Sequence, residues 1–266
     1  MSDSLLTTSD VAALMGVGAT SVKRWADAGV LRCVKTAGGH RRFLRTEVDR
    51  FLNSQVPMGE DEHDPLGADA WIRTLKGLPD VHLVQAKLLE MRARRGSWWR
   101  AADDLGRVLA RLTQAWRNSE MSVLEERVAS ELLHRAVANV ALNLPLKPGA
   151  PRLLLANAPG DDYTLGLSLA ELTARERGWF TIWAGRRAPV DELICWAQGE
   201  RVHMMHVSAS HASTDADGLR HVAGGLADAC SHSATRLILG GAGAWPESTP
   251  GAGRVWSMEQ LRGALN

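Results

Sequence analysis

The sequence lacks most of the features that mark a secreted, membrane-bound or zinc-binding protein. Its three cysteines, at positions 33, 195 and 230, are far apart and form no CxxC pair, which argues against a disulfide framework or a zinc knuckle. No stretch approaches the roughly 18 uninterrupted apolar residues of a membrane span, and the N-terminal residues lack the basic-then-apolar pattern of a signal peptide. We therefore expect a cytoplasmic protein with reduced thiols and no membrane partner.

Signatures of catalysis are also missing. No Ser/His/Asp order, metal triad or paired-carboxylate spacing stands out, so we expect no enzyme and no clustered metal site. The chain has ten tryptophans but only one tyrosine, Tyr163. Its 266 residues are 45% hydrophobic and 23% charged, which suits a globular protein of two or three packed domains.

Positive charge is concentrated near the N-terminus, although the net charge of the chain is only +1. Between residues 20 and 45 the seven basic side chains are accompanied by a single acid, Asp27. A cationic patch of this density is how a small module meets phosphates. A charge run alone is more often a solvated face, so the local pattern has to support the nucleic-acid interpretation.

Residues 1–52 carry the pattern of a winged helix-turn-helix. Thr8 can cap a first helix that stops at Gly16, and a second helix begins near Ala19 and ends at Gly29. Two β-like runs at 30–35 and 41–44, joined by a glycine-containing turn, predict a hairpin, and a short helix at 46–52 closes the module. In a helix-turn-helix the second helix enters the major groove. This places four side chains toward DNA: Thr20, Ser21, Lys23 and Arg24.

The stretch TSDVAALMGVGATSVKRWADAGVL followed by TAGGHRRF resembles the DNA-binding domain of MerR-type regulators, in which the module ends in a T-x-G-G-H-R-R wing. The similarity extends over roughly residues 6 to 52. It implies a recognition helix around Ser21 to Trp25, and double-stranded operator DNA as the partner. Trp25, Phe43 and Phe51 are expected to pack a small core. The phosphate or minor-groove contacts that the resemblance implies come from Lys35, His40, Arg41 and Arg42.

The middle of the chain is predicted to be helical. Residues 53–68 are polar and acidic without periodicity, which indicates a linker. A short helix at 68–76 and three longer periodic stretches within 69–145 predict a four-helix bundle, and Ser122 and Glu125 form a capping box before the last helix. The predicted apolar faces are Val81, Val84, Leu88 and Met91; Trp98, Ala101, Leu105, Val108, Leu112 and Trp116; and Leu124, Val128, Leu132 and Val137.

Residues 151–266 alternate short apolar runs with stretches of helical period. Strands are predicted at 153–156, 180–183, 202–208, 237–239 and 254–256, and helices at 165–177, 190–197, 219–230 and 258–265. Five βα units predict a flavodoxin-like, Rossmann-type parallel sheet, whose ligands bind at the carboxyl ends of the strands. The fold class is therefore multidomain, α and α/β.

Small residues follow four of the predicted strands, in the loops PGDDYTLG, AGRRAP, Ser208 to Ser210 and Gly240 to Gly243. Such residues let a large, flat ligand approach the backbone, and short hydroxyls can hydrogen-bond to it. No G-x-G-x-x-G follows the first strand, which argues against a dinucleotide.

These loops and the preceding helices resemble the cobalamin-binding module of corrinoid methyltransferases and of the CarH/LitR family of light-sensing repressors. The family pattern D/E-x-H-x-x-G supplies the lower axial histidine of cobalt, and here Tyr163 stands in the place of that histidine. The family pattern W-x9-E-H lies over the upper face of cobalt, and here Arg127 replaces its histidine. The ligand contacts expected from this resemblance are Trp116, Val123, Glu126, Arg127, Asp161, Tyr163, Gly166, Ser208, Ser210, Gly240 and Gly241.

The resemblance implies a dimeric or tetrameric repressor. Adenosylcobalamin would assemble its DNA-binding tetramer in the dark, and light would release it by cleaving the cobalt–carbon bond. A phenol, however, must lose a proton of reference pKa about 10 before it ligates well, whereas imidazole offers a neutral nitrogen near pH 7. Histidine-type ligation at this position is therefore not expected.

Three interpretations of the C-terminal module stay open. Cobalamin binds with its own base on the metal, or weakly base-off, and Tyr163 hydrogen-bonds it; the ligand is a different tetrapyrrole; or the module binds no ligand and serves oligomerisation. His211 is the only histidine predicted near the ligand rim, and a solvated loop residue is its expected role. Rival functions are a corrinoid carrier or binding protein, and a regulator controlled by a partner protein that docks on the helical bundle.

Overall fold

The computed structural model describes residues 5–15, 19–27, 31–36, 38–45, 47–48 and 67–266. The chain divides into two compact units, Met1–Pro145 and Leu146–Asn266. Almost all of the helix predicted at 46–52 and of the linker predicted at 53–68 lies outside the described residues. Within the described ranges, no helix combines the length and the apolar character that a bilayer span requires.

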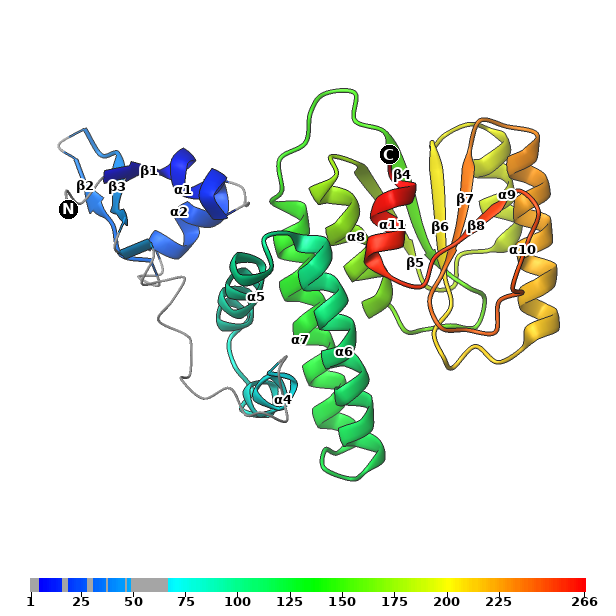
Figure 1. Cartoon of the computed structure of the whole chain (residues 1–266), viewed down its shortest axis with the longest axis horizontal. Helices are drawn as coiled ribbons and strands as arrows, with labels where there is room; N and C mark the ends of the chain where they lie inside the picture. The colour runs from blue at the N-terminus through cyan, green and yellow to red at the C-terminus, as the bar shows by residue number, and fades with distance from the viewer. Residues whose placement is uncertain (1–4, 16–18, 28–30, 37, 46, 49–66) are drawn as a thin grey trace. The chain divides into compact units, whose positions relative to one another are not determined.

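The N-terminal part contains two helices and a small antiparallel sheet (Figure 1). Its elements are β1 (Leu5–Thr7), α1 (Thr8–Met15), α2 (Ala19–Asp27), β2 (Val34–Lys35) and β3 (Arg41–Leu44). Strand β3 lies between β1 and β2, so the sheet has one strand more than the predicted hairpin. Strand β1 is not predicted from the sequence, because three residues are too few to show the alternation of apolar and polar side chains that marks a strand. A third strand gives the hairpin stability that two strands alone rarely have in water. The core is formed by Val11, Val22, Leu31, Phe43 and Val48.

Helix α1 begins at Thr8, one residue earlier than a cap at Thr8 would place it. The hydroxyl of Thr7, rather than that of Thr8, accepts a hydrogen bond from the backbone N–H of Asp10 at 3.1 Å. In return, the Asp10 carboxylate accepts from the Thr7 backbone N–H at 2.8 Å. This reciprocal pair satisfies two backbone donors at the helix start, which a cap at Thr8 would not have done with Asp10.

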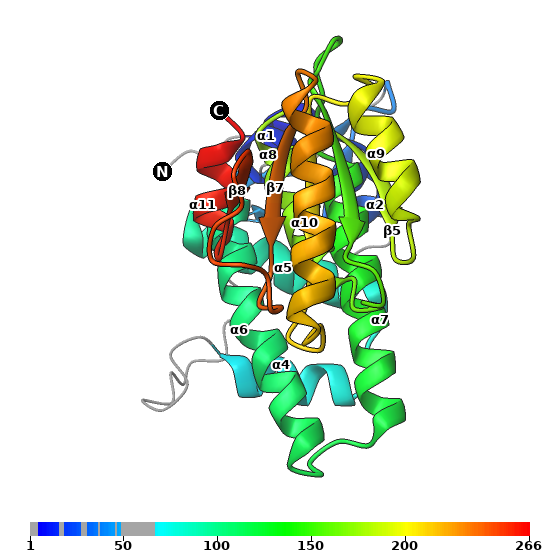
Figure 2. The same cartoon turned by 90° about the vertical axis from the view of Figure 1, so that its right-hand side faces the viewer.

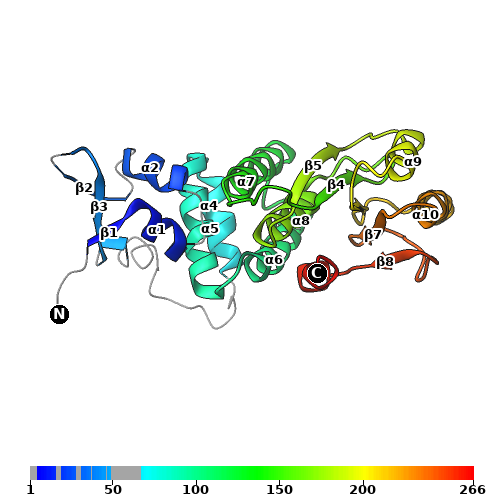
Figure 3. The same cartoon turned by 90° about the horizontal axis from the view of Figure 1, so that it is seen from above.

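Four helices follow: α4 (Ala68–Lys76), α5 (Val81–Arg95), α6 (Trp98–Arg117) and α7 (Val123–Leu142). Helices α6 and α7 contact each other and both contact α4 and α5, and Figure 3 shows α5, α6 and α7 seen from above. Helix α4 has the bounds that the sequence predicts. The capping box is confirmed, because Ser122 Oγ accepts from the Glu125 backbone N–H and the Glu125 carboxylate accepts from the Ser122 backbone N–H.

The predicted inner face of α7 is confirmed at Val137, which is buried, but is wrong at Leu124 and Val128. Leu124 is 71% exposed and Val128 38% exposed, and Trp116 at the end of α6 is 44% exposed. Helix α7 is apolar on two faces, and the face that carries alanines lets neighbouring helices approach closely, so periodicity alone could not choose between them. The buried face consists of Ala129, Leu133, Ala136, Val137 and Val140.

The second unit is a five-stranded parallel sheet covered by helices on both faces (Figures 1 and 2). The strand order β5-β4-β6-β7-β8 is the flavodoxin-like order that the sequence predicts. Its elements are β4 (Arg152–Asn157), α8 (Leu165–Glu176), β5 (Phe180–Gly185), α9 (Val190–Gln198), β6 (Met204–Ser208), α10 (Ala216–Ser231), β7 (Arg236–Gly240), β8 (Ala252–Arg254) and α11 (Met258–Ala264).

Three details of this unit differ from the prediction. Strand β8 begins two residues earlier than the strand predicted at 254–256. Strands β7 and β8 are joined by residues 241–251 without a helix, because glycines and two prolines in that segment oppose helix formation. His203, predicted on the third strand, precedes β6, and its Nδ1 accepts from the Arg152 backbone N–H at 3.0 Å.

The faces of the sheet pack against different helices. Leu154, Met205 and Val207 belong to the core shared with α9 and α10, which stand in front of the sheet in Figure 2. Leu153 and Met204 belong to the core shared with α8 and α11. This alternation is the period of two expected of strands. Pairing also brings the last residues of three strands side by side at what we call the carboxyl edge: Asn157, Ser208 and Gly240.

Candidate nucleic-acid interface and ligand site

A cavity of about 340 Å³ lies on the N-terminal part, between the start of α1, helix α2 and the β2–β3 hairpin. Its walls combine cationic side chains with hydroxyls at a helix N-terminus, where unpaired backbone N–H groups attract anions. Four of its residues are predicted DNA contacts, Lys23, His40, Arg41 and Arg42. The others are Thr7, Thr8, Ser9 and Gly39.

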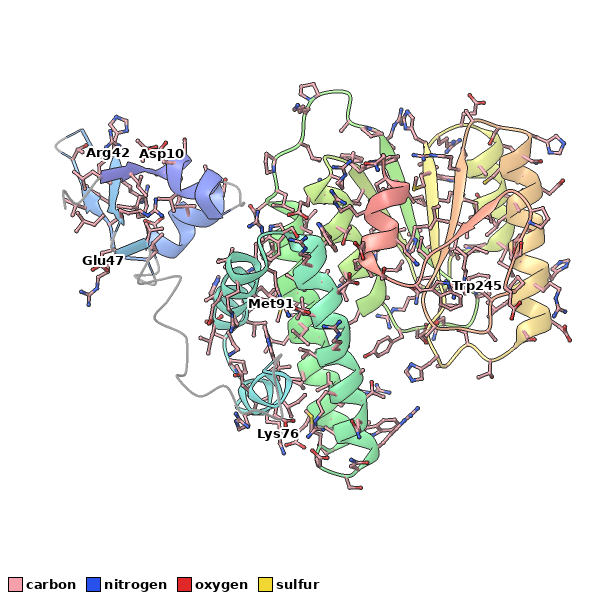
Figure 4. All side chains as sticks on the ribbon, viewed as in Figure 1. Asp10, Arg42, Glu47, Lys76, Met91 and Trp245 are labelled. Atoms are coloured by element: carbon pink, nitrogen blue, oxygen red, sulfur yellow. The ribbon has the colours of Figure 1, made fainter. Side chains whose placement is uncertain are left out.

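Asp10 lies beside this cavity, where it caps the start of α1 and carries a negative charge. Hydrogen bonds from the backbone N–H and the hydroxyl of Thr7 hold the pKa of Asp10 below its ordinary value, and the nearby charge of Arg42 contributes less. Asp10 and Arg42 are labelled next to each other in Figure 4. The carboxylate stays ionised while it caps the helix, so its negative charge lowers part of the positive potential that Arg42 gives to the cavity.

The two adjacent arginines of the hairpin have different surroundings. Arg41 Nη2 forms an ion pair with Asp27 Oδ1 at 2.5 Å, which ties β3 to the last residue of α2. The Arg41 side chain is only 20% exposed. Arg42 Nη1 donates to the backbone oxygen of Arg41 at 3.1 Å. No carboxylate forms an ion pair with Arg42 among the described residues, although the charge of Asp10 acts on it at longer range.

The remaining predicted DNA contacts are placed as follows. Thr20 and Lys23 are exposed on α2, and Lys35 and His40 are exposed on the hairpin. Gly39 has φ 77°, a conformation that favours glycine, and its N–H donates to Thr36 O at 2.8 Å to close the turn. The side chains of Ser21, Arg24 and Trp25, and all of Phe51, lie outside the described residues.

The hydroxyls of Thr7, Thr8 and Ser9 are the part of this interface that the sequence prediction missed. The signal was available in the run TTSD, because hydroxyl side chains beside the positive end of a helix dipole can themselves donate to an anion. Only Thr8 is assigned a role from the sequence, as a helix cap.

At the carboxyl edge of the second unit, Asp161 joins two loops. Its side chain is buried, with Oδ1 accepting from the Tyr163 backbone N–H at 2.9 Å and Oδ2 accepting from Ser213 Oγ at 2.8 Å. Oδ2 also accepts from the backbone N–H of Ser210. Asn157 Nδ2 donates to the backbone oxygens of Asp161 and Tyr163 at 3.0 and 3.1 Å. The carboxylate predicted to contact a ligand is thus committed to the chain itself.

Tyr163 and His211 lie together although they come from different loops. Their ring centroids are 6.5 Å apart at an interplanar angle of 66°, an edge-to-face contact. His211 is exposed, as expected of a loop residue, and Tyr163 is half-buried. The structure therefore places an imidazole next to the phenol that stands where the family has a histidine.

The glycines of the carboxyl edge make room for the chain's own atoms. A Cβ atom on Gly240 would collide with the imidazole of His206, and one on Gly241 with the backbone oxygen of Ala209. A Cβ on Gly243 would lie 2.5 Å from Ala209 Cβ, and one on Gly166 3.6 Å from Ser208 Oγ. The Gly243 N–H donates to Ala209 O at 2.8 Å, and the Ala209 N–H donates to Gly240 O at 3.0 Å. These glycines let two loops meet.

His206, on the central part of β6, is 3% exposed. Burial, and to a smaller extent the charge of Arg254, lowers its pKa to about 4. The ring is therefore neutral at pH 7. Its Nδ1 has no hydrogen-bond partner within the described part of the chain.

The ligand contacts predicted in the first unit gather at one end of the α6–α7 hairpin. Trp116 and Val123 are 44% and 55% exposed. Glu126 accepts from Ser130 Oγ at 2.7 Å, and Arg127 is exposed. No group of three or more metal-binding side chains occurs in the described ranges.

Comparison with known proteins identifies the N-terminal part. Residues 5–56 match the family model described as a helix-turn-helix domain. No curated protein matches the chain. Residues 5–56 are therefore a helix-turn-helix module.

Three solved structures resemble the chain over most of its length. One is a cobalamin-binding protein from Desulfitobacterium hafniense DCB-2, with 14% identity, a TM-score of 0.36, and coverage of 74% of this chain and 96% of that one. The second is the monomethylamine corrinoid protein of Methanosarcina barkeri, with 12% identity, a TM-score of 0.49, and coverage of 81% and 93%. The third is the methanol:cobalamin methyltransferase complex of M. barkeri, with 12% identity, a TM-score of 0.32, and coverage of 82% and 89%.

The residues of the carboxyl edge do not fit a cobalamin ligated by a loop histidine. The predicted ligand position holds Tyr163, the oxygens of Asp161 accept hydrogen bonds from the chain, and His206 and Ala209 fill the spaces beside Gly240 and Gly241. A cobalamin that keeps its own base on cobalt needs neither a histidine donor nor room for a released base, so these residues do not conflict with that form.

Proposed function

We propose that the protein is a DNA-binding transcriptional repressor with a regulatory C-terminal unit. The observation that carries the DNA-binding half is the cationic cavity at the start of α1, in a segment that matches a helix-turn-helix domain. Helix α2 enters the major groove with Thr20 and Lys23, and the hairpin lies along the backbone as the wing. A phosphate occupies the cavity, where the N–H groups of α1 and the charge of Arg42 stabilise it.

The experiment is duplex binding by the full chain over a range of salt concentrations. Phosphate contacts release counterions, so the logarithm of the binding constant is expected to fall linearly with the logarithm of salt concentration, by about 0.9 per contact. If the binding constant does not depend on salt concentration, or if the chain binds no duplex, the DNA-binding half of the proposal is contradicted. That result would favour a corrinoid carrier.

The regulatory half of the proposal concerns the second unit and helices α4–α7. Its ligand is cobalamin that keeps its own base on cobalt, supported by the sequence resemblance and by the absence of conflict with the carboxyl edge. Self-association into a dimer or tetramer couples this ligand to DNA binding, because paired half-sites need paired modules. Absorption spectra recorded with adenosylcobalamin in the dark and then in light test both the ligand and its light response. If the protein retains no corrinoid, the regulatory half of the proposal is contradicted and the DNA-binding half still stands.

A second candidate is regulation by a partner protein, favoured by the exposed apolar side chains at one end of the α6–α7 hairpin. Apolar groups gathered on a surface mark interaction sites more often than scattered ones do. This candidate predicts that no chromophore loads, and that replacing Leu124 with a charged residue changes regulation without changing DNA affinity. The group consists of Trp116, Val123, Leu124 and Val128.

A further inference from the structure

We propose that the N-terminal part holds a second binding site, for a small organic anion with an apolar body, and that this ligand competes with DNA for Arg42. The site is a cavity of about 440 Å³ beside the β2–β3 hairpin, larger than the cationic cavity at the start of α1. Small-molecule pockets measure roughly 300–1,000 Å³. Arg42 and Glu47, two of the residues that line it, are labelled in Figure 4. The competition rests on the proposed function, whereas the binding site does not.

The apolar wall of this cavity comes from the hairpin and from the residues that precede it. Leu31 is buried, Leu44 is half-buried, and Val34 is 61% exposed. An exposed aliphatic side chain on a cavity wall gains stability when a ligand removes it from water. The wall therefore favours a ligand with an apolar body.

Two arginines give the cavity its positive charge. Arg32 is exposed and Arg42 is half-buried. Glu47 supplies the only carboxylate among the described residues of the lining, so the two guanidinium groups leave a net positive charge. A guanidinium pairs with a carboxylate through two parallel hydrogen bonds. Cations beside an aliphatic wall select an organic anion over a neutral apolar molecule and over a small inorganic anion.

Arg42 also lines the smaller cavity, so the two sites share one side chain. On β3 it pairs with Thr7 of β1 on one side and with Val34 of β2 on the other. Residues directly opposite each other in antiparallel strands share a face of the sheet, so these three side chains form one row with Arg42 in the middle. Thr7 lines the smaller cavity and Val34 the larger one. A guanidinium held by a carboxylate on the Val34 side is withdrawn from a phosphate on the Thr7 side, and each ligand lowers the affinity for the other by the same factor.

Cys33 lines the larger cavity and serves as a chemical reporter for it. The probe is dithiobis(nitrobenzoate), an aromatic disulfide that carries carboxylates, and dithiodipyridine is its neutral counterpart. The Cys33 thiolate attacks one sulfur of either reagent, a mixed disulfide forms, the original disulfide breaks, and the other half leaves as a coloured thiolate or thione. The full-length Cys195→Ser variant is used, because Cys195 is exposed and Cys230 is buried. Both reagents need the same thiolate, so the ratio of the two labelling rates measures the attraction of the anionic reagent alone.

We expect the labelling rate with dithiobis(nitrobenzoate) to reach a maximum as its concentration rises to the millimolar range, because the reagent binds before it reacts. Naphthoate, an unreactive anion of the same class, should slow this labelling, and acetate should not. Arg32→Ala and Arg42→Ala should each lower the ratio of rates several-fold. Arg45→Ala is the matched control, because Arg45 is an exposed cation directly after β3 and does not line the cavity. A rate that rises without a maximum, or a ratio that both lining variants leave unchanged, overturns the site.

Competition with DNA is measured with the same anion at constant ionic strength. Naphthoate should weaken duplex binding by the full-length protein several-fold, and a bound duplex should slow the labelling of Cys33 by dithiobis(nitrobenzoate). In Arg42→Ala, the residual duplex affinity should no longer respond to naphthoate. If naphthoate slows labelling and leaves the duplex affinity of the wild type unchanged, the competition for Arg42 is overturned. If the chain binds no duplex, the proposed function fails, and the labelling rates still decide whether the site exists.

Discussion

Arg41 and Asp27 form an ion pair that fastens the β2–β3 hairpin to helix α2. The neighbouring Arg42 has no such carboxylate partner among the described ion pairs, and it lines the cationic cavity. Two arginines that are equivalent in the sequence motif therefore have different expected roles. We expect Arg42 to contact DNA and Arg41 to position the hairpin that carries Arg42.

The first prediction separates these roles by the salt dependence of DNA binding. Arg42→Ala should lower the slope of the logarithm of affinity against the logarithm of salt by about 0.9, because one phosphate contact is lost. Arg41→Ala should weaken binding while leaving the slope nearly unchanged. Asp27→Asn is the matched control, since it breaks the same ion pair without touching a cation. Equal slope changes for both arginine variants would contradict this assignment.

The second prediction concerns the glycines of the carboxyl edge. Gly240→Ala should destabilise the protein by about 1–3 kcal/mol, because the added methyl group meets the buried His206 ring in a packed interior. Gly224→Ala is the control. Gly224 lies in α10 with open space around it, and alanine is favoured over glycine in a helix by up to about 1 kcal/mol. Chemical denaturation of both variants checks the difference, and equal stabilities would mean that the edge is not closed in solution.

The third prediction follows from the lowered pKa of His206. Its folded pKa of about 4 lies below the ordinary value of 6.5, so the unfolded chain binds a proton first as the pH falls. The stability from the neutral buried ring is complete above pH 6.5 and is lost as the pH falls toward 4. The shift corresponds to about 3 kcal/mol at 1.36 kcal/mol per pH unit. We expect His206→Gln to lose this part of the pH dependence in denaturation curves, and His232→Ala to keep it.

The fourth prediction concerns Asp161. Replacing it with alanine leaves the buried donors of Tyr163, Ser210 and Ser213 without their acceptor, at about 1–3 kcal/mol for each group that stays buried and unpaired. Asp161→Asn keeps one carbonyl oxygen and should lose less stability. Thermal unfolding of the two variants measures the difference, and the alanine variant is expected to unfold at the lower temperature. An alanine variant as stable as the wild type would show that the carboxylate is available to a ligand.

The sequence predicted the elements of this protein better than it predicted which of their faces are buried. The bounds of α4 and the start of α7 follow from patterns that local residues control, such as the helical period of residues 68–76 and the capping box at Ser122. The inner face of α7 could not be predicted, because both Leu124 and Leu133 lie on apolar stripes of correct period. Only packing against other helices decides between them.

The candidate ligand site shows the same limit. Small residues at strand ends were predicted to admit a ligand, and the loops that carry them were located correctly. The occupant of the space could not be inferred from the motif, because His206 lies two residues before Ser208 and reaches Gly240 only across the pairing of β6 with β7. A glycine that makes room for another loop looks the same in the sequence as a glycine that makes room for a ligand.

The last prediction concerns Tyr163, which stands where the family motif has a histidine. Tyr163→His restores that motif, so we expect it to strengthen cobalamin binding and to shift the absorbance toward a histidine-ligated spectrum, because a neutral imidazole ligates a metal at pH 7 and a protonated phenol does not. Absorption spectra of the wild type and the variant, each incubated with adenosylcobalamin in the dark and then passed through gel filtration, measure both effects. A variant whose uptake and spectrum equal those of the wild type would show that residue 163 does not occupy the axial-ligand position.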